Sequence, residues 1–304
     1  MLYSSHKNGK RFDEKMNTKV IMVCNNKGGV GKTTCAAAIA DVLARKMNLP
    51  TLIVDADPQG NISSRFGYRP EFVSVKNSLD VCLFNEFKSR DDSSNNESIP
   101  IEYFFNDCKF PIQLGDDKKY DNLKIICASS TLEKIIAMYF TMPQKFEGLW
   151  NNVISKIKNL NQFEYVIIDT QPNLSYFLSQ IMMASDYVIV PVEPTEDSFS
   201  GAKAIGNVFN SVANKKRTLE IDNKINFLGV VFNKWRLGTI AARKFEKELT
   251  KIWGNNPIFK TKIPANQDAI NAANLFAPVT LVKPYSSSAS AFRNLVREVV
   301  EKID

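Results

Sequence analysis

The chain has 304 residues, 44% of them hydrophobic and 23% charged, so it is long enough to bury a large core. It contains no apolar run long enough to cross a bilayer, and residues 1–18 lack the apolar middle of a signal peptide, so we expect a cytoplasmic protein. The net charge of +7 is uneven: residues 203–304 carry 17 Lys and Arg against 8 Asp and Glu, whereas residues 1–202 carry 22 against 24. A basic last third indicates either a surface for a polyanion or a solvated lysine-rich face.

Cysteine and histidine usage gives no sign of a metal cluster or a histidine base. The five cysteines form no CxxC pair, so we expect buried free thiols rather than disulfides, zinc ligands or iron–sulfur ligands. The single histidine, His6, lies in the polar start of the chain, which we interpret as an extension without a fold of its own. Catalysis by a histidine base is therefore not expected.

A glycine-rich loop between a strand and a helix is the first functional element along the chain. An apolar run at residues 20–24 predicts a buried strand, and the alanine-rich segment 35–47 predicts a helix. The loop between them reads Asn26-Lys27-Gly28-Gly29-Val30-Gly31-Lys32-Thr33-Thr34. Glycines let backbone N–H groups approach an anion, and the helix dipole favours negative charge at the same point. We therefore expect nucleotide binding by residues 27–34, with Lys32 on the β and γ phosphates and the Thr33 hydroxyl on Mg²⁺.

Two aspartates follow the next predicted strand. The buried run at residues 51–54 ends in Asp55 and Asp57, which precede Pro58-Gln59-Gly60-Asn61. Their spacing places both carboxylates on one side of the strand end, beside the glycine loop if the sheet is parallel. Carboxylates in that place can orient a water molecule or hold a metal ion.

The middle of the chain supplies a third acidic strand end. Residues 91–98 are a polar surface loop, and a strand at 123–127 is followed by helices up to Met142 and from Gln144 to Leu160, which we assign to packing. The apolar residues 165–168 then lead into Asp169. As the third such strand end in a phosphate-loop protein, this pattern predicts an aspartate bound to Mg²⁺ through water.

Later elements repeat the alternation of strand and helix. Strands are predicted at 187–192 and 227–232, the second ending in Asn233, with a helix at 197–213 between them. A short strand precedes Pro264, and residues 288–303 form an amphipathic helix with acidic residues on its polar face. Nearly all-apolar strands that alternate with helices predict an α/β fold, a mostly parallel twisted sheet with helices on both faces. We expect residues 19–304 to form a single domain.

The motif KGGVGKTT resembles the deviant Walker A loop of the ParA/MinD family of ATPases, and DADPQGN and the strand ending in Asp169 are similar to two further motifs of that family. The resemblance covers the chain from about residue 19 to the end. It implies a P-loop ATPase that uses ATP and Mg²⁺, in which Lys27 reaches the nucleotide of a second subunit. It also implies that Asp57 orients the attacking water and belongs to the Mg²⁺ site, that Asn233 contacts adenine and that Pro264 contacts the base through its backbone. Where relatives have two prolines after Asp-Thr, this chain has Gln171-Pro172.

The resemblance to ParA implies a slow, switch-type ATPase for plasmid or chromosome segregation. Its ATP-bound homodimer would bind double-stranded DNA without sequence preference, in association with the nucleoid, and a ParB-like centromere-binding protein would stimulate hydrolysis. Candidate DNA contacts are Arg236, Arg243, Lys244 and the cluster Lys215-Lys216-Arg217. The alternative is a MinD-like membrane switch that uses the helix at 288–303, although we expect that helix to pack against the protein.

Overall fold

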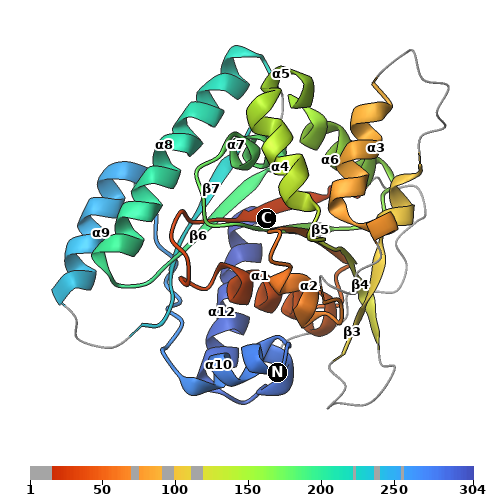
Figure 1. Ribbon diagram of the computed structural model, residues 1–304. Coiled ribbons are helices and arrows are strands. Elements are labelled where there is room, and N and C mark those ends of the chain that lie inside the picture. The colour runs from red at the N-terminus through yellow and green to blue at the C-terminus, as the bar shows by residue number, and fades with distance from the viewer. Residues whose placement is uncertain are drawn as a thin grey trace.

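A seven-stranded sheet forms the centre of the computed structural model, which describes residues 16–69, 75–90, 99–110, 119–221, 224–235, 240–254 and 257–304 (Figure 1). The strands are β1 (Lys19–Val23), β2 (Thr51–Ala56), β3 (Asn106–Lys109), β4 (Lys119–Ile126), β5 (Tyr165–Thr170), β6 (Tyr187–Val192) and β7 (Asn226–Phe232). Their order is β3-β4-β2-β5-β1-β6-β7, and all neighbours are parallel except the edge pair β3 and β4. This arrangement confirms the predicted fold class.

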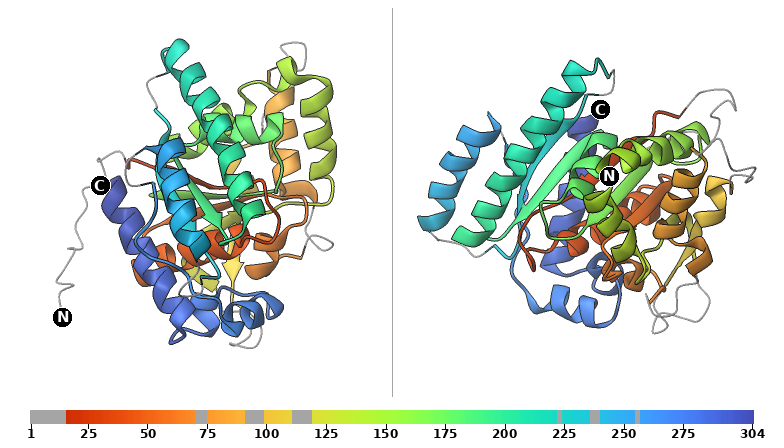
Figure 2. Two further views of the ribbon diagram at one scale, coloured as in Figure 1. Left: turned by 90° about the vertical axis from the view of Figure 1, so that its left-hand side faces the viewer. Right: turned by 45° about the horizontal axis from the view of Figure 1, so that its top comes forward.

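Helices cover both faces of the sheet (Figures 1 and 2). One face carries the α3–α9 layer, which consists of α3 (Leu79–Lys88), α4 (Leu132–Thr141), α5 (Pro143–Phe146), α6 (Leu149–Asn159), α7 (Tyr176–Ala184), α8 (Glu196–Thr218) and α9 (Ile240–Trp253). The other face carries the α1/α12 layer, which consists of α1 (Lys32–Asp41), α2 (Asn61–Arg65), α10 (Gln267–Asn274), α11 (Val279–Val282) and α12 (Ser287–Ile303). Figure 2 shows α8 and α9 side by side at one end of the sheet.

The central strands are apolar because both of their faces are buried. In β1, Val20 and Met22 pack into the α3–α9 layer, whereas Ile21 and Val23 pack into the α1/α12 layer. All four side chains are fully buried. Successive residues of a strand point to opposite faces, so one strand contributes to both cores.

Several predicted elements differ from the structure in their bounds. The first helix begins at Lys32 and continues after Asp41 as a π-helical turn, Val42–Lys46. The helix predicted at 144–160 is two helices, since Gly148 between α5 and α6 has φ 73°. The edge strand β3 was not predicted, because its sequence NDCK contains no apolar run.

The ends of the chain also bear on the predictions. Thr18, the last residue of the predicted extension, is buried and its hydroxyl donates a 2.7 Å hydrogen bond to the Phe163 carbonyl. Residues 1–15 and the polar segment 91–98 lie outside the described residues. Within the described ranges, every helix is either too short or too polar to span a bilayer.

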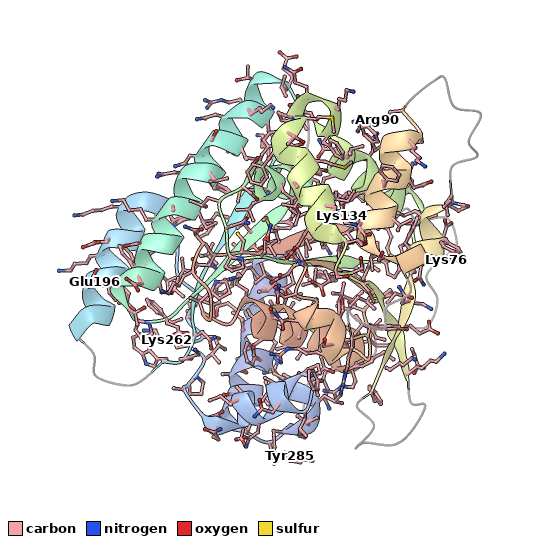
Figure 3. All side chains as sticks on the ribbon, in the orientation of Figure 1. Lys76, Arg90, Lys134, Glu196, Lys262 and Tyr285 are labelled. Carbon is pink, nitrogen blue, oxygen red and sulfur yellow. The ribbon has the colours of Figure 1, made fainter. Side chains whose placement is uncertain are left out.

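The C-terminal helix α12 is part of the core. Its apolar residues Phe292, Leu295, Val296 and Val299 are buried in the α1/α12 layer, where the helix contacts α1 and α11. Near its start, Tyr285 is 98% exposed at the outer side of this layer (Figure 3). The apolar face of α12 is therefore covered by protein, as we expected.

Candidate nucleotide-binding site

The glycine loop lies at the carboxyl edge of the sheet, between β1 and α1. Val23 at the end of β1 is in register with Asp169 of β5, and Asp169 is in register with Asp55 of β2. The three strands are neighbours, so the three predicted motifs meet at one edge. Ligands of parallel α/β sheets bind at this edge, outside the carboxyl ends of the strands.

Position 31 requires a glycine, because any side chain there would force the loop to change its conformation. It has φ 89° and directly precedes α1, and a Cβ placed on it would lie 1.9 Å from Asn233 Nδ2. Gly29 also has a positive φ, 79°. The loop therefore passes close to the end of β7 and reaches the first turn of α1, where backbone N–H groups have no partner within the helix.

Lys32 is buried inside the loop. Its Nζ donates a 3.0 Å hydrogen bond to the Lys27 carbonyl, and the residue is 7% exposed. Burial lowers the pKa of Lys32, an effect opposed by the carboxylates of Asp169 and Asp57. The ammonium group thus lies between the loop backbone and two carboxylates, where we expect a lysine that binds the phosphates of a nucleotide.

Asp169 is a fully buried carboxylate whose two oxygens have no hydrogen-bond partner among the described residues. Burial raises its pKa to about 7, while the nearby Thr33 hydroxyl and the charge of Lys32 favour the ionised form. A buried carboxylate without a donor fits a cation. Mg²⁺ keeps several of its waters in proteins, so one or two carboxylates and the Thr33 hydroxyl suffice to hold it.

The two aspartates after β2 have different surroundings. Asp55 is fully buried and accepts hydrogen bonds from Ser63 N at 3.0 Å and Ser63 Oγ at 2.5 Å, and burial raises its pKa to about 8. Asp57 Oδ1 accepts a 3.0 Å hydrogen bond from Gln59 N. Burial raises the Asp57 pKa, opposed by that bond and by Lys32. Asp55 therefore fixes the turn into α2, and Asp57 is the one of these two carboxylates whose charge acts on Lys32.

Asn233 and Lys234 tie the end of β7 to the glycine loop. Asn233 Nδ2 donates to the Val30 carbonyl at 2.9 Å, and Lys234 Nζ donates to the Gly29 carbonyl at 3.0 Å. Pro264 lies beside this strand end, since it forms a parallel bridge with Trp235. The structure thus brings Asn233 and Pro264 to the same edge as the loop, and their contacts with a base remain predictions.

Lys27 lies on the surface of the loop. Its side chain is 47% exposed, and its Nζ is 3.2 Å from Asp197 Oδ2 in the first turn of α8. The two lysines of the loop thus differ sharply, because Lys32 is enclosed by its own chain and Lys27 is open to solvent.

A family model described as an AAA domain, AAA_31, matches residues 18–221. Sporulation initiation inhibitor protein Soj of Bacillus subtilis is 26% identical over 92% of this chain and 98% of its own length. The chain belongs to the ParA/MinD-type P-loop ATPases. The uncharacterized protein MJECL24 of Methanocaldococcus jannaschii is 28% identical over 93% of this chain and 99% of its own length.

Solved structures agree on the fold. The ATP complex of a Cyanothece McdA variant has a TM-score of 0.69 at 18% identity, and the alignment covers 93% of this chain and 96% of that one. The ATPase fold is therefore retained where few residues are identical.

Asn25 is a site residue of this ATPase that the sequence analysis missed. Its side chain is buried, Nδ2 donates to the Pro191 carbonyl at 2.7 Å, and Oδ1 accepts from Lys27 N at 3.1 Å. A Cβ on Gly201 of α8 would lie 2.5 Å from that same Oδ1. The one available signal was a polar residue between an apolar strand and a glycine loop.

Arg65 was also missed. Its guanidinium is buried beside the loop, with Nη2 donating to Thr34 Oγ1 at 3.2 Å and Nη1 donating to the Ala277 carbonyl at 3.3 Å. In the sequence it follows the polar pair Ser63-Ser64, which gives no sign that Arg65 is buried.

The candidate DNA contacts are only partly described. Arg236 lies outside the described residues, and of Arg243 and Lys244 only the helical backbone in α9 is described. Lys216 corrects one expectation, because it is 3% exposed and its Nζ donates to the Ser185 carbonyl at 3.1 Å. A side chain so enclosed is not available to DNA, whereas its neighbours Lys215 and Arg217 are exposed.

Proposed function

We propose that this chain is a partition ATPase whose ATP-bound homodimer binds double-stranded DNA without sequence preference and is released by hydrolysis. The observation that carries the proposal is the contrast between the two loop lysines, Lys32 within its own loop and Lys27 on the surface. An exposed lysine in a phosphate loop is suited to neutralise the nucleotide of a second subunit, as an arginine finger does in trans. ATP then acts as the link between two copies.

The surroundings of each residue support its role in the cycle. Mg²⁺ would be held by the Thr33 hydroxyl and Asp169 with Asp57 nearby, and when bound it neutralises charge on the β and γ phosphate oxygens. Lys32 binds the same phosphates from inside the loop, and Asp57 orients the attacking water. Slow turnover suits such a switch.

Light scattering tests the dimer. With ATP and Mg²⁺ the native chain is expected to elute with the mass of a dimer, and Lys27→Ala is expected to stay monomeric while it still binds nucleotide. Lys203→Ala, which removes an exposed lysine from α8, is the matched control and should dimerise normally. ATP-dependent dimers of Lys27→Ala equal to those of the native chain would contradict the proposal.

DNA binding is supported by the basic last third of the chain, in which 17 Lys and Arg stand against 8 Asp and Glu. Lysines and arginines that replace counterions on phosphates make affinity fall linearly with salt on logarithmic scales. We expect co-sedimentation with random-sequence duplex DNA that requires ATP and weakens steeply with salt. Retention that is insensitive to both ATP and salt would argue against this part of the proposal.

We expect a centromere-binding partner of the ParB type to complete the cycle by accelerating hydrolysis, which releases the protein from the DNA of the nucleoid. The test is the ATPase rate with DNA, measured with and without a small DNA-binding protein encoded next to this chain. A rate that such a protein leaves unchanged would count against a partition role.

A MinD-like membrane switch remains the alternative role. Such a switch needs an amphipathic helix free to enter a bilayer surface, whereas the apolar face of α12 is buried against α1. With ATP present, co-sedimentation with anionic liposomes and with DNA are the two arms of one experiment. Binding to liposomes alone would favour the membrane role.

A further inference from the structure

Arg65 is a buried cation next to the phosphate loop, and the geometry points to it as a positioning residue for the nucleotide. We infer that it orients the Thr34 hydroxyl toward a phosphate oxygen and adds positive charge behind the loop. This inference rests on the proposed binding of a nucleotide at the loop, and it concerns a residue to which neither the glycine motif nor the acidic strand ends assign a role.

The side chain of Arg65 crosses from α2 to two other segments. It is 9% exposed, with Nη2 at 3.2 Å from Thr34 Oγ1 in the first turn of α1 and Nη1 at 3.3 Å from the Ala277 carbonyl. Among the described residues, no carboxylate forms an ion pair with it. Burying a guanidinium without a counterion costs free energy, and a bound polyphosphate would supply the missing negative charge.

The surrounding charges agree with an anion site. Burial lowers the pKa of Arg65, and Asp169 is the carboxylate that acts in the opposite direction. Asp169 itself lacks a hydrogen-bond partner among the described residues and is assigned to the metal. Once a cation occupies Asp169, the phosphates are the remaining counterions for Arg65.

The direction of the hydrogen bond explains the effect on Thr34. A hydroxyl has one hydrogen to donate and two lone pairs that accept. Because the guanidinium can only donate, Thr34 Oγ1 accepts from Arg65 and keeps its hydrogen for another acceptor. Thr34 lies in the first turn of α1, where the helix dipole favours an anion, so a phosphate oxygen is the fitting acceptor.

Arg65 also fastens the segment between α10 and α11, and this structural role needs its own control. Arg45 provides it, since Arg45 Nη2 donates to the Thr280 carbonyl at 2.9 Å in α11, which directly follows that segment. Arg45 also donates two hydrogen bonds to Asp41, at the far end of α1 from the loop, and lies near Tyr120. Arg45→Met therefore removes a comparable fastening without touching Thr34.

Calorimetric titration with ADP and with a non-hydrolysable ATP analogue, both with Mg²⁺, tests the inference. We expect Arg65→Met to weaken both affinities about tenfold, as for one charge-assisted hydrogen bond. Arg65→Lys should recover part of the loss, and Arg45→Met should bind like the native chain. At saturating ATP, we expect the kcat of Arg65→Met to stay within about twofold, since its effect is on binding.

A double-mutant cycle with Thr34→Val separates positioning from folding. If Arg65 acts through the Thr34 hydroxyl as well as through its charge, the double variant loses less affinity than the losses of the two single variants added together. Native nucleotide affinity in Arg65→Met would overturn the inference, and so would affinity losses that are additive in the double variant. If Arg65→Met fails to fold, the nucleotide affinity of Thr34→Val alone provides a test. A native chain that binds no nucleotide would instead defeat the proposed function, so the two failures are distinguishable.

Discussion

At the residue scale, Lys27 has two competing partners. In the structure its Nζ pairs with Asp197 of the same chain, and both side chains are largely exposed, at 47% and 77%. Exposed pairs of this kind contribute little to stability and are screened by salt. The ion pair is therefore weak enough to break when a second subunit presents a nucleotide. For the dimer to form, Lys27 has to exchange Asp197 for that nucleotide.

Asp197→Asn tests this competition. We expect ATP-dependent dimers to form about two- to fivefold more tightly at low salt, with the difference vanishing at high salt, and stability to fall by less than about 1 kcal/mol. Glu133→Gln, which removes an exposed carboxylate from α4, controls for net charge. Sedimentation equilibrium gives the dimer affinities. Weaker dimers in Asp197→Asn would mean that this carboxylate assists assembly instead.

Lys216 predicts a pH dependence of stability. Burial lowers its pKa from 10.5 to about 8, the Asp186 carboxylate opposes this shift and Lys158 adds to it. Below pH 8 both the folded and the unfolded chain carry the proton. Between pH 8 and 10.5 the folded chain has released a proton that the unfolded chain still binds, so this residue makes the free energy of unfolding rise with pH.

The matched comparison is Lys216→Met. The free energy of unfolding of the native chain minus that of the variant should increase by about 2 kcal/mol from pH 7.5 to 9.5, as measured by urea denaturation. Other titrating groups are common to both proteins and cancel in the difference. A difference that stays constant with pH would show that the Lys216 amine keeps its ordinary pKa in the folded chain.

At the scale of elements, α8 is fitted closely against the start of the phosphate loop. A Cβ on Gly201 would lie 2.5 Å from Asn25 Oδ1 and 3.2 Å from Lys27 N. Asn25 cannot swing aside without losing its hydrogen bonds to the Pro191 carbonyl and Lys27 N. The glycine thus allows the helix that carries Asp197 to reach the loop.

Gly201→Ala should therefore be harmful although alanine is the better helix former. Overpacking costs about 1–3 kcal/mol, whereas the gain in helix propensity is about 1 kcal/mol at most. We expect a net loss of about 1–2 kcal/mol in thermal unfolding and weaker ATP binding, since the loop start is displaced. Lys203→Ala on the same helix should change neither. A stabilised Gly201→Ala variant with native affinity would contradict this packing argument.

The elements that sequence predicted well are those with short-range patterns. The run from β1 through the loop to α1, and the strand that leads to Asp169, are encoded by neighbouring residues. The break at Gly148 and the edge strand β3 depend on tertiary contacts, and their local sequences are ambiguous. Asn25 and Arg65 were missed because their partners, Pro191 and Ala277, lie 166 and 212 residues away along the chain.

At the scale of the whole molecule, the two helical layers share the residues of one sheet. Alternate side chains of β1 belong to opposite cores, so neither layer can unfold without exposing strands that the other one buries. All three tryptophans report on the α3–α9 layer: Trp150 is buried in it, and Trp235 and Trp253 pack against it. Tryptophan emission therefore reports from a distance on a substitution in the α1/α12 layer.

Leu295→Ala uses this reporter. Leu295 is fully buried in the α1/α12 layer, and its truncation is expected to cost about 2–5 kcal/mol. If the described residues form one cooperative unit, tryptophan emission and far-UV circular dichroism will show a single transition, shifted equally in both signals. Leu219→Ala, which shortens a 56% exposed leucine, should leave the midpoint unchanged. An unshifted tryptophan transition together with a biphasic dichroism curve would contradict this expectation. It would mean that the α1/α12 layer unfolds while β1 stays packed against the α3–α9 layer, so that the two layers fold independently.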